Sequence, residues 1–334
     1  PSSARASGVE CSMWIVKPLN SSCGRGIRVI SELEEVNFSE AAVLQRYLHT
    51  PMLLDGFKFD LRVYVLVTRF APLEAYVYSN GLARFSSKPY TTSAEGHSDK
   101  LVHLTNSSIQ KHTGAVLPFL QAATEQEAAG TKCSLAYLWG LIAARGGNAT
   151  GLWKEVKLCV LKSLVCVDDV IRSQPSCFEL YGFDVMLDSA GKGWLIEVNA
   201  SPSLACGTAL DTQLKTAVMR DTLRLVSPSP VLPSLLEQTL QTAASAGNTP
   251  SGWADGISRS TLNTRVRPYG APSPDVVHHT DCITRGGSVL PFQVPVDEET
   301  ANGFELLCPN TPEHSAITEL KYSVFTSSLN KAGR

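Results

Sequence analysis

The sequence lacks the features that would place it in several common classes of protein. Its nine cysteines include no C-x-x-C pair and no spacing typical of a zinc site. No apolar segment approaches the roughly 20 residues needed to span a bilayer. A net charge of −2 provides no general attraction to nucleic acid or to a membrane surface. The odd, scattered set of cysteines and the lack of a recognisable signal peptide favour reduced thiols in the cytosol.

Two apolar segments flank the sequence SAGKG at 189–193, which predicts a β-hairpin. If the turn centres on its Ala-Gly bond, Asp184 faces Glu197, and the period of two places Asn199 on the same face. Buried like charges that converge in this way need a cation between them. Oxygen ligands without sulfur or imidazole predict Mg²⁺, delivered with a nucleotide.

The alternative for this hairpin is a pair of solvated charges at a sheet edge. Against it, the apolar residues Trp194, Leu195, Ile196 and Val198 predict burial on at least one side. A shift of one residue in the turn would separate the two carboxylates.

The segment from Met13 to Ile30 predicts two short strands around a Ser/Cys/Gly loop. Lys17 supplies positive charge, and Gly24 and Gly26 allow the backbone to approach a phosphate closely. No helix follows the loop, so neither a Rossmann turn nor a Walker loop fits. An ordinary hairpin turn remains the alternative.

The segment FKFDLRVYVLVT at 57–68 predicts a strand with one apolar face and one charged face. Lys58, Asp60 and Arg62 form the charged face, and a solvated outer face is the alternative. Because the strand continues with Val65, Leu66 and Val67, we expect an interior position in which the charges meet a ligand or counter-charges.

An Asn80-Gly81 pair is expected to form a tight turn that leads into LARF. Arg84 then lies among apolar neighbours, where a guanidinium is suited to bidentate binding of a carboxylate or phosphate.

Five motifs, in this order, resemble the tubulin-tyrosine-ligase-like family: WIVKP…GRGI, FKFDLRVYVLVT, GLARF, HLTNSSIQK and CFELYGFDVMLD…WLIEVNASPSL. The resemblance runs from about Trp14 to about Val226. It implies the ATP-grasp fold, an α/β (α+β) architecture of largely antiparallel sheets with flanking helices. The EVNASPSL ending and the HLTN motif are more similar to the polyglutamylase members than to the founding tyrosine ligase. The resemblance also implies an N-terminal lobe, which this chain is expected to lack.

The resemblance implies an ATP-dependent ligase that adds glutamate to glutamate side chains of tubulin tails through an acyl phosphate. The implied cofactors are ATP and Mg²⁺, and the implied partners are tubulin tails, microtubules, free glutamate and an accessory subunit. The implied locations are the cytoplasm and cytoskeleton, including the cilium or flagellum and the basal body. Three alternatives stay open, namely a tubulin glycine ligase, a non-catalytic tubulin-binding member of the family, and an ATP-grasp ligase acting on a small molecule.

The resemblance also implies a role for each matched residue. The nucleotide positions are the phosphate lysines Lys17 and Lys58, the loop Gly24, Arg25, Gly26 and Ile27, the adenine segment Gln45, Arg46, Tyr47 and Leu48, and the contacts Asp60, Thr105 and Asn106. The reaction positions are Arg62 and Lys58 as catalytic residues, Arg84, Lys111 and Ser108 for the incoming amino acid, and Asp184, Glu197 and Asn199 for Mg²⁺. Ser107 stands where many glutamylating members carry tyrosine.

The chain divides by composition into three zones. Residues 1–12 are small and polar, and residues 13–227 carry alternating strands and helices and form the expected catalytic domain. Residues 228–334 are rich in Pro, Ser, Thr and Gly and are expected to be mostly disordered. Short helices are expected within this extension near 231–244 and 313–330.

The expected helices of the catalytic domain follow from apolar periodicity. Apolar residues repeat at intervals of three to four between Trp153 and Ile171, which predicts an amphipathic helix packed on the core. A second helix is predicted from about Asp211 to Val226. The Ala/Gly/Glu-rich segment 113–131 is predicted to be a loop.

Overall fold

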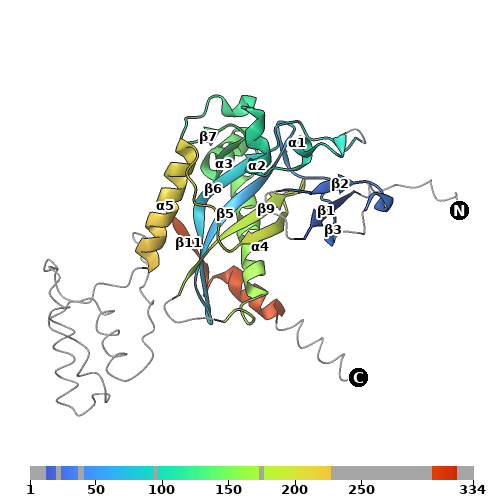
Figure 1. Cartoon of the computed structure of the whole chain (residues 1–334). Coiled ribbons are helices and arrows are strands. Elements are labelled where there is room, and N and C mark those ends of the chain that lie inside the picture. The colour runs from blue at the N-terminus through green and yellow to red at the C-terminus, as the bar shows by residue number, and fades with distance from the viewer. Residues whose placement is uncertain are drawn as a thin grey trace, which may run out of the picture.

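A computed structural model describes residues 13–19, 24–36, 41–93, 96–172, 177–226 and 303–321. The fold is mixed α+β, with two antiparallel sheets and flanking helices (Figure 1). The fold class predicted from the sequence is therefore confirmed. The predicted helix near 231–244 lies outside the described residues. Within the described part of the chain, no helix is long and apolar enough to cross a bilayer.

The main sheet has eight strands, and its principal path runs β10-β9-β5-β6-β8-β7, with β4 beside β5 and β11 beside β6. Their bounds are β4 (Leu53–Leu54), β5 (Phe57–Phe70), β6 (Leu73–Phe85), β7 (Ala128–Ala129), β8 (Lys132–Ser134), β9 (Glu179–Leu187), β10 (Gly193–Asn199) and β11 (Phe304–Cys308). Every ladder described in this sheet is antiparallel.

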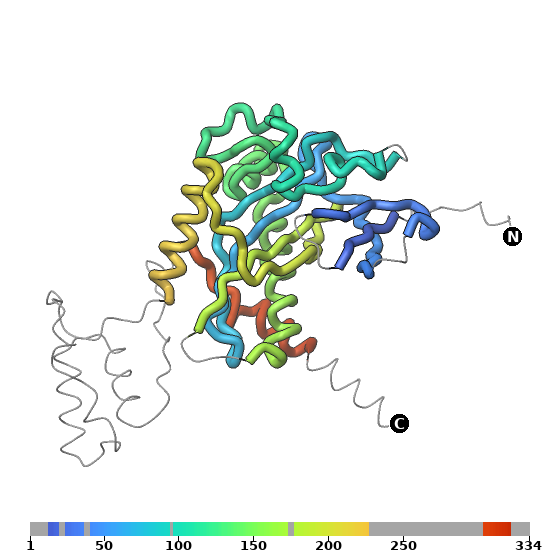
Figure 2. The backbone as a smooth tube through the Cα atoms, in the orientation of Figure 1, coloured from blue at the N-terminus to red at the C-terminus, as the bar shows by residue number. Residues whose placement is uncertain are grey.

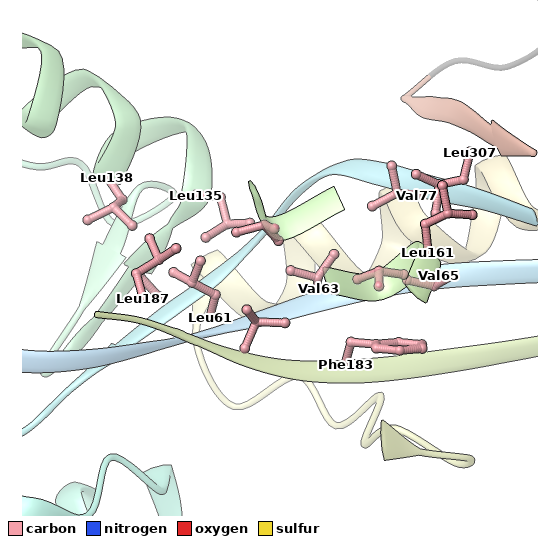
Figure 3. Close-up of a cluster of buried hydrophobic side chains, with 14 of the residues drawn as sticks. Leu61, Val63, Val65, Val77, Leu135, Leu138, Leu161, Phe183, Leu187 and Leu307 are labelled. Carbon is pink, nitrogen blue, oxygen red and sulfur yellow. The ribbon is translucent and has the colours of Figure 1, made fainter. Parts of the chain in front are cut away.

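One face of the main sheet carries the largest hydrophobic core. Leu61, Val63 and Val65 alternate along β5, as a period of two requires, and pack beside Phe183 and Leu187 of β9 (Figure 3). Helices α3 (Leu135–Ala144) and α4 (Ala149–Val165) cover this face. The charged residues of β5 must therefore point to the opposite face.

The opposite face of the sheet is covered by helix α5 (Ala209–Val226) along only part of its length (Figure 1). Tyr64 and Leu66 of β5 pack there against Leu214 and Val218 of α5. Lys58, Asp60 and Arg62 precede Tyr64 on the same face of the strand. The uncovered part of this face is thus the charged part.

The predicted helix from Asp211 to Val226 is confirmed by α5. The helix predicted between Trp153 and Ile171 exists, but α4 begins at Ala149, where Asn148 caps it, and ends at Val165. Beyond Val165 the chain turns and forms no further α-helical turn, so the prediction for Val167 to Ile171 was wrong. Segment 113–131 is mostly irregular, as predicted, with a short 3-10 helix η4 (Pro118–Leu120) and strand β7.

The pair Asn80-Gly81 forms no turn, so that prediction was wrong. Both residues lie inside β6, which continues from Leu73 to Phe85. The ladder with β5 shifts between Val63 and Val65, and a Cβ on Gly81 would lie 2.3 Å from the carbonyl oxygen of Arg62. The glycine therefore permits a close backbone approach at a β-bulge, which Asn-Gly can mark as readily as a hairpin turn.

A C-terminal strap (residues 303–321) belongs to the fold, although it lies in the region 228–334 that was predicted to be mostly disordered. Strand β11 pairs with β6, and residues 312–321 form a helix that overlaps the predicted one near 313–330. The strap is attached to α4, because Glu305 binds Lys157 Nζ at 2.7 Å and accepts a hydrogen bond from Trp153. The apolar alternation of only five residues in a Pro/Ser/Thr-rich region gave too weak a signal to predict this strand.

The second sheet has three strands in the order β2-β1-β3, with bounds Arg28–Ile30 for β2, Trp14–Pro18 for β1 and Ala42–Arg46 for β3. It lies beside the main sheet near α1 (Figure 2). The remaining short helices are η1 (Leu33–Glu35), α1 (Lys100–His103), α2 (Ser107–Gln110) and η3 (Lys111–Thr113). The predicted strand at WIVKP and the second strand near Ile27 are confirmed as an antiparallel pair.

Candidate active site

A cleft of about 500 Å³ lies where the small sheet, the charged face of the main sheet and the segment after α1 meet. Its charged and polar lining includes Lys17, Gln45, Arg46, Lys58, Asp60, Arg84, Thr105, Asn106, Asp184 and Glu197. Its apolar lining includes Ile15, Ile27, Leu48, Met186, Trp194, Leu195 and Ile196. A cleft with an apolar wall and convergent charged groups suits a ligand that has one apolar part and one anionic part.

The floor of the cleft is the charged row of β5, which confirms the interior position predicted for that strand. Strand β5 lies between β9 and β6, and Lys58 and Asp60 are only 2% and 4% exposed. Arg62 is also largely buried, and it contacts Asp184 on β9. The alternative of a solvated outer face is excluded by this burial.

Two arginines and two aspartates form one ion-pair network at this floor. The Arg84 guanidinium donates through Nε and Nη2 to both carboxylate oxygens of Asp60, and through Nη2 to Asp184 Oδ2 at 2.8 Å. Arg62 donates through Nε and Nη2 to the two oxygens of Asp184. The counter-charges expected for the buried row are therefore supplied by the chain itself.

These contacts keep the network ionised. Burial alone would raise the pKa of Asp184, but Arg84 and Arg62 hold it below its ordinary value. Burial opposes the charge of Arg84, yet Asp60 and Asp184 raise the pKa of Arg84 above its ordinary value. One lone pair of Asp184 Oδ1 and the Nη1 group of Arg84 have no partner among the described residues.

The Asp184–Glu197 pair predicted from the hairpin is confirmed, although by a different register. Trp194 pairs with Met186, which centres the turn on Ala190 rather than on the Ala-Gly bond. A register shift between Leu195 and Glu197 then places Glu197 opposite Asp184. Asn199 pairs with Gly182, and its Nδ2 donates to Glu197 Oε1 at 3.2 Å.

The burial predicted for the second strand of this hairpin was wrong. Strand β10 is an edge strand, and Trp194, Leu195 and Val198 are 42%, 39% and 43% exposed. Trp194, Leu195 and Ile196 instead line the cleft. Their apolar character therefore forms a wall of the cleft rather than a protein core, and Glu197 is exposed to the cleft while Asp184 is buried.

The predicted adenine segment lies at the cleft, and some of its polar groups bond within the protein. Gln45 Oε1 accepts from Lys17 Nζ at 2.9 Å, and the backbone N–H of Tyr47 donates to Met13 at 2.8 Å. The Tyr47 side chain is buried, and its hydroxyl contacts Lys58 and His103. The bond to Lys17 uses one lone pair of Gln45 Oε1, so the amide keeps further hydrogen-bonding capacity for a base.

Other predicted residues do not line this cleft. Gly24, Arg25, Ser108 and Lys111 line a separate hollow of about 490 Å³ beside α2, and Gly26 lines a third hollow. Gly24 has φ +76°, a backbone conformation that favours glycine, and an added Cβ would lie 2.7 Å from the end of the Ile109 side chain on α2. Arg62 and Asn199 do not line the cleft themselves. Arg62 bonds to Asp184, and Asn199 bonds to Glu197, and both of these carboxylates line it.

The His103 side chain and the bond of the Tyr47 hydroxyl to Lys58 were not predicted from the sequence. His103 lines the cleft, and its position in HLTN, directly before the two predicted nucleotide contacts, was an available signal. The hydroxyl of Tyr47 was assigned to the adenine segment as part of the backbone there, whereas it bonds Lys58 at 2.8 Å. Nothing in the sequence placed residue 47 beside residue 58.

The donor set suits a hard divalent cation. Asp184 Oδ1, Glu197 and the amide of Asn199 are oxygen donors on neighbouring positions of one hairpin, which fits Mg²⁺ better than a softer metal. The described residues contain no cluster of three His, Cys, Asp or Glu side chains, so a protein-only cage is absent there. Mg²⁺ commonly keeps several waters and binds through one or two carboxylates and substrate phosphates.

These features define an α+β protein with a cleft that has an apolar wall and a charged floor. The chain belongs to the tubulin-tyrosine ligase family, whose sequence model matches residues 2–238. The family predicted from the five motifs is confirmed, and the match ends before the strap.

The relatives include several tubulin-modifying enzymes. Human tubulin polyglutamylase TTLL5 is 38% identical over 221 residues, which cover 64% of this chain and 17% of that protein. Mouse tubulin monoglutamylase TTLL4 is 40% identical over 220 residues, covering 64% and 18%. Tubulin polyglutamylase ttll-5 of Caenorhabditis elegans is 41% identical over 233 residues, covering 66% and 32%. The chain thus spans less than a third of the length of each of these relatives.

Proposed function

We propose that this chain carries the catalytic site of an ATP-dependent ligase that adds glutamate to glutamate side chains of tubulin tails. The observation that carries the proposal is the ion-pair network of Asp60, Arg84, Asp184 and Arg62 at the floor of a cleft in a tubulin-tyrosine ligase fold. The names of the relatives support tubulin as the modified protein and glutamate as the added amino acid. A cytoplasmic, cytoskeletal location follows from that substrate.

The nucleotide is expected to place its base against the apolar wall and its phosphates over the floor. Trp194, Met186 and Leu48 supply flat or flexible apolar surface. Lys17 and Lys58 supply positive charge at the same cleft, and neither forms a salt bridge with a described carboxylate. Electrostatic groups fixed before the reaction stabilise the charge that develops during phosphoryl transfer.

Arg84 is the expected binding group for the carboxylate of the incoming glutamate. Asp60 and Asp184 fix its guanidinium plane, and its Nη1 group is left without a partner among the described residues. A guanidinium held in this way can offer Nη1 to a second carboxylate without reorientation. Lys111 and Ser108 lie at a separate hollow, so their predicted role requires α2 to move or the substrate to extend to it.

The chemistry requires an activated acyl group, because a carboxylate is a poor acyl donor. The terminal phosphoryl group is transferred from ATP to the tubulin carboxylate, and ADP leaves. The amino group of free glutamate then attacks the acyl carbon, loses a proton, and expels phosphate. Bound at Asp184, Glu197 and Asn199, Mg²⁺ would neutralise charge on the phosphate oxygens. In both steps, the role of this protein is to hold the phosphates and to orient the tubulin carboxylate and the free glutamate.

The deciding experiment incubates the chain with ATP, Mg²⁺, microtubules and isotopically labelled glutamate or glycine in parallel. Label from glutamate on tubulin, absent with Glu197→Gln, supports the proposal. Label from glycine would indicate a glycine ligase. Microtubule binding without label from either amino acid would indicate a non-catalytic tubulin-binding protein. Label transfer to a small acceptor without tubulin would indicate a small-molecule ligase.

A further inference from the structure

The ammonium of Lys58 is held by neutral groups. Nζ donates to the Tyr47 hydroxyl at 2.8 Å and to the backbone carbonyl of His103 at 2.7 Å. Lys58 is 2% exposed, and Nζ also lies over the Tyr47 ring at 4.7 Å from the centroid. An ammonium has three N–H donors, so one donor is left, and Lys58 lines the cleft.

The direction of each hydrogen bond beyond Lys58 follows from one carbonyl. His103 Nε2 lies 3.0 Å from the carbonyl oxygen of Gly96, which can only accept, so Nε2 carries the proton. In a neutral ring Nδ1 is then an acceptor, and the Tyr47 hydroxyl, 2.9 Å away, donates to it. A lone pair of that hydroxyl accepts from Lys58.

Packing fixes the orientation of the His103 imidazole. His103 is 2% exposed and lies between two aromatic rings in edge-to-face contact. The Tyr47 centroid is 5.5 Å away at 84°, and the Tyr90 centroid is 5.6 Å away at 85°. A half-turn of the imidazole would place carbon atoms at the Tyr47 hydroxyl and at the Gly96 carbonyl, so both hydrogen bonds of the ring would be lost.

We propose that Tyr47 and His103 are positioning residues that direct the third N–H of Lys58 at an anionic oxygen of the nucleotide. This inference rests on the proposed function for the identity of the ligand. The hydrogen bonds that link Gly96, His103, Tyr47 and Lys58 are read from interatomic distances and do not depend on which ligand binds. A carboxylate in place of Tyr47 would hold the ammonium as well, but it would repel the phosphate.

The charges around Lys58, Tyr47 and His103 support this arrangement. Burial, together with Lys17 on β1, lowers the pKa of Lys58 to about 7, and Asp60 on the same strand opposes this shift. Burial and Lys58 lower the pKa of His103 to about 4, with His97 acting in the same sense and Asp99 against it. Burial and the nearby Tyr90 raise the pKa of Tyr47 above its ordinary value. Near pH 7, Tyr47 thus keeps its proton, His103 stays neutral, and Lys58 gains charge when an anion binds.

The first test uses the full chain without any ligand. Long-range proton–nitrogen correlation spectra of the histidine rings should show His103 as the neutral Nε2–H tautomer from pH 5 to pH 8. Protonation of His103 within this range, or an Nδ1–H tautomer, would overturn the inference. This measurement requires no variant and does not depend on enzymatic activity.

The second test compares Tyr47→Phe with Tyr78→Phe. Tyr78 is a matched control, because its buried hydroxyl bonds Asp221 at 2.9 Å beneath α5, away from the cleft. Loss of the Tyr47 hydroxyl removes an acceptor from the charged form of Lys58. Calorimetric affinity of Tyr47→Phe for ATP-Mg²⁺ should be within about twofold of wild type at pH 6 and at least about tenfold weaker at pH 8.5.

The outcomes separate the inference from the proposed function. Unchanged pH dependence in Tyr47→Phe, or an equal change in Tyr78→Phe, would overturn the positioning role. Absence of ATP binding in the wild-type chain would overturn the nucleotide as ligand, and with it the role proposed for the third N–H. The hydrogen-bond chain itself is judged by the tautomer of His103 in either case.

Discussion

Glu197 faces Asp184 only because strand β10 carries one extra residue between Leu195 and Glu197. Without this bulge, the register set by Trp194 and Met186 would place Ile196 opposite Asp184, and the Glu197 side chain would lie on the other face. The bulge therefore brings the second carboxylate to the cleft. It also re-aims the strand at its exposed edge, where Trp194 forms part of the wall.

Glu197→Gln is expected to abolish ligase turnover and to leave the unfolding free energy within about 0.5 kcal/mol of wild type, because the side chain is exposed and has no ion pair among the described residues. The substitution removes a negative charge that Mg²⁺ needs. The measurements are labelled-glutamate transfer and urea unfolding. Glu179→Gln, an exposed carboxylate at the start of β9, is the control and should stay active. Turnover retained by Glu197→Gln at saturating Mg²⁺ would contradict the metal role.

Arg84→Ala is expected to destabilise the fold by about 3–5 kcal/mol, because Asp60 loses its only described ion-pair partner and Asp184 loses one of two. Arg145→Ala is the matched control, since Arg145 also forms a bidentate pair, with Asp55, but at an exposed site. That pair should contribute at most about 1 kcal/mol. Denaturant unfolding near pH 7 measures both. Equal losses in the two variants would show that the buried network does not depend on Arg84.

Lys58→Met is expected to change how stability depends on pH. The pKa of Lys58 is lowered to about 7 by burial, whereas an unfolded lysine has a pKa near 10.4. Between these values the unfolded chain binds more protons than the folded one, so wild-type stability gains from a rise in pH. The difference in unfolding free energy between wild type and Lys58→Met should therefore shift in favour of wild type from pH 7 to pH 10. A constant difference over this range would show that Lys58 is charged in the folded protein throughout.

Leu307→Ala in the strap is expected to cost about 2–4 kcal/mol, because Leu307 is 5% exposed and packs in the main core. The adjacent Leu306 points to the other face of β11 and is 48% exposed, so Leu306→Ala should cost less than about 0.5 kcal/mol. Thermal or urea unfolding of the full chain distinguishes them. If both substitutions are neutral, the strap does not contribute to the stability of the sheet.

The charged row of β5 and the carboxylate pair of the hairpin could be predicted from the sequence, because strand periodicity fixes which side chains share a face. Contacts between distant segments could not be predicted in this way. The distances from Lys58 to Tyr47 and from Arg84 to Asp60 depend on the register between strands, and the register of β6 depends on a bulge that resembled a turn. The exposure of β10 could not be predicted from the sequence either, because a strand that forms an apolar cleft wall and a strand in the core have the same composition.

The alternation along β5 separates the tasks of its two faces. Leu61, Val63 and Val65 belong to the same hydrophobic core as residues of α3 and α4, whereas Lys58 and Asp60 line the cleft and Arg62 bonds Asp184 beside it. Stabilising substitutions can therefore be sought on the first face without altering any group that would touch a ligand. For protein engineering, the core beneath α4 is the place to raise thermal tolerance, and the cleft face is the place to alter what the protein accepts.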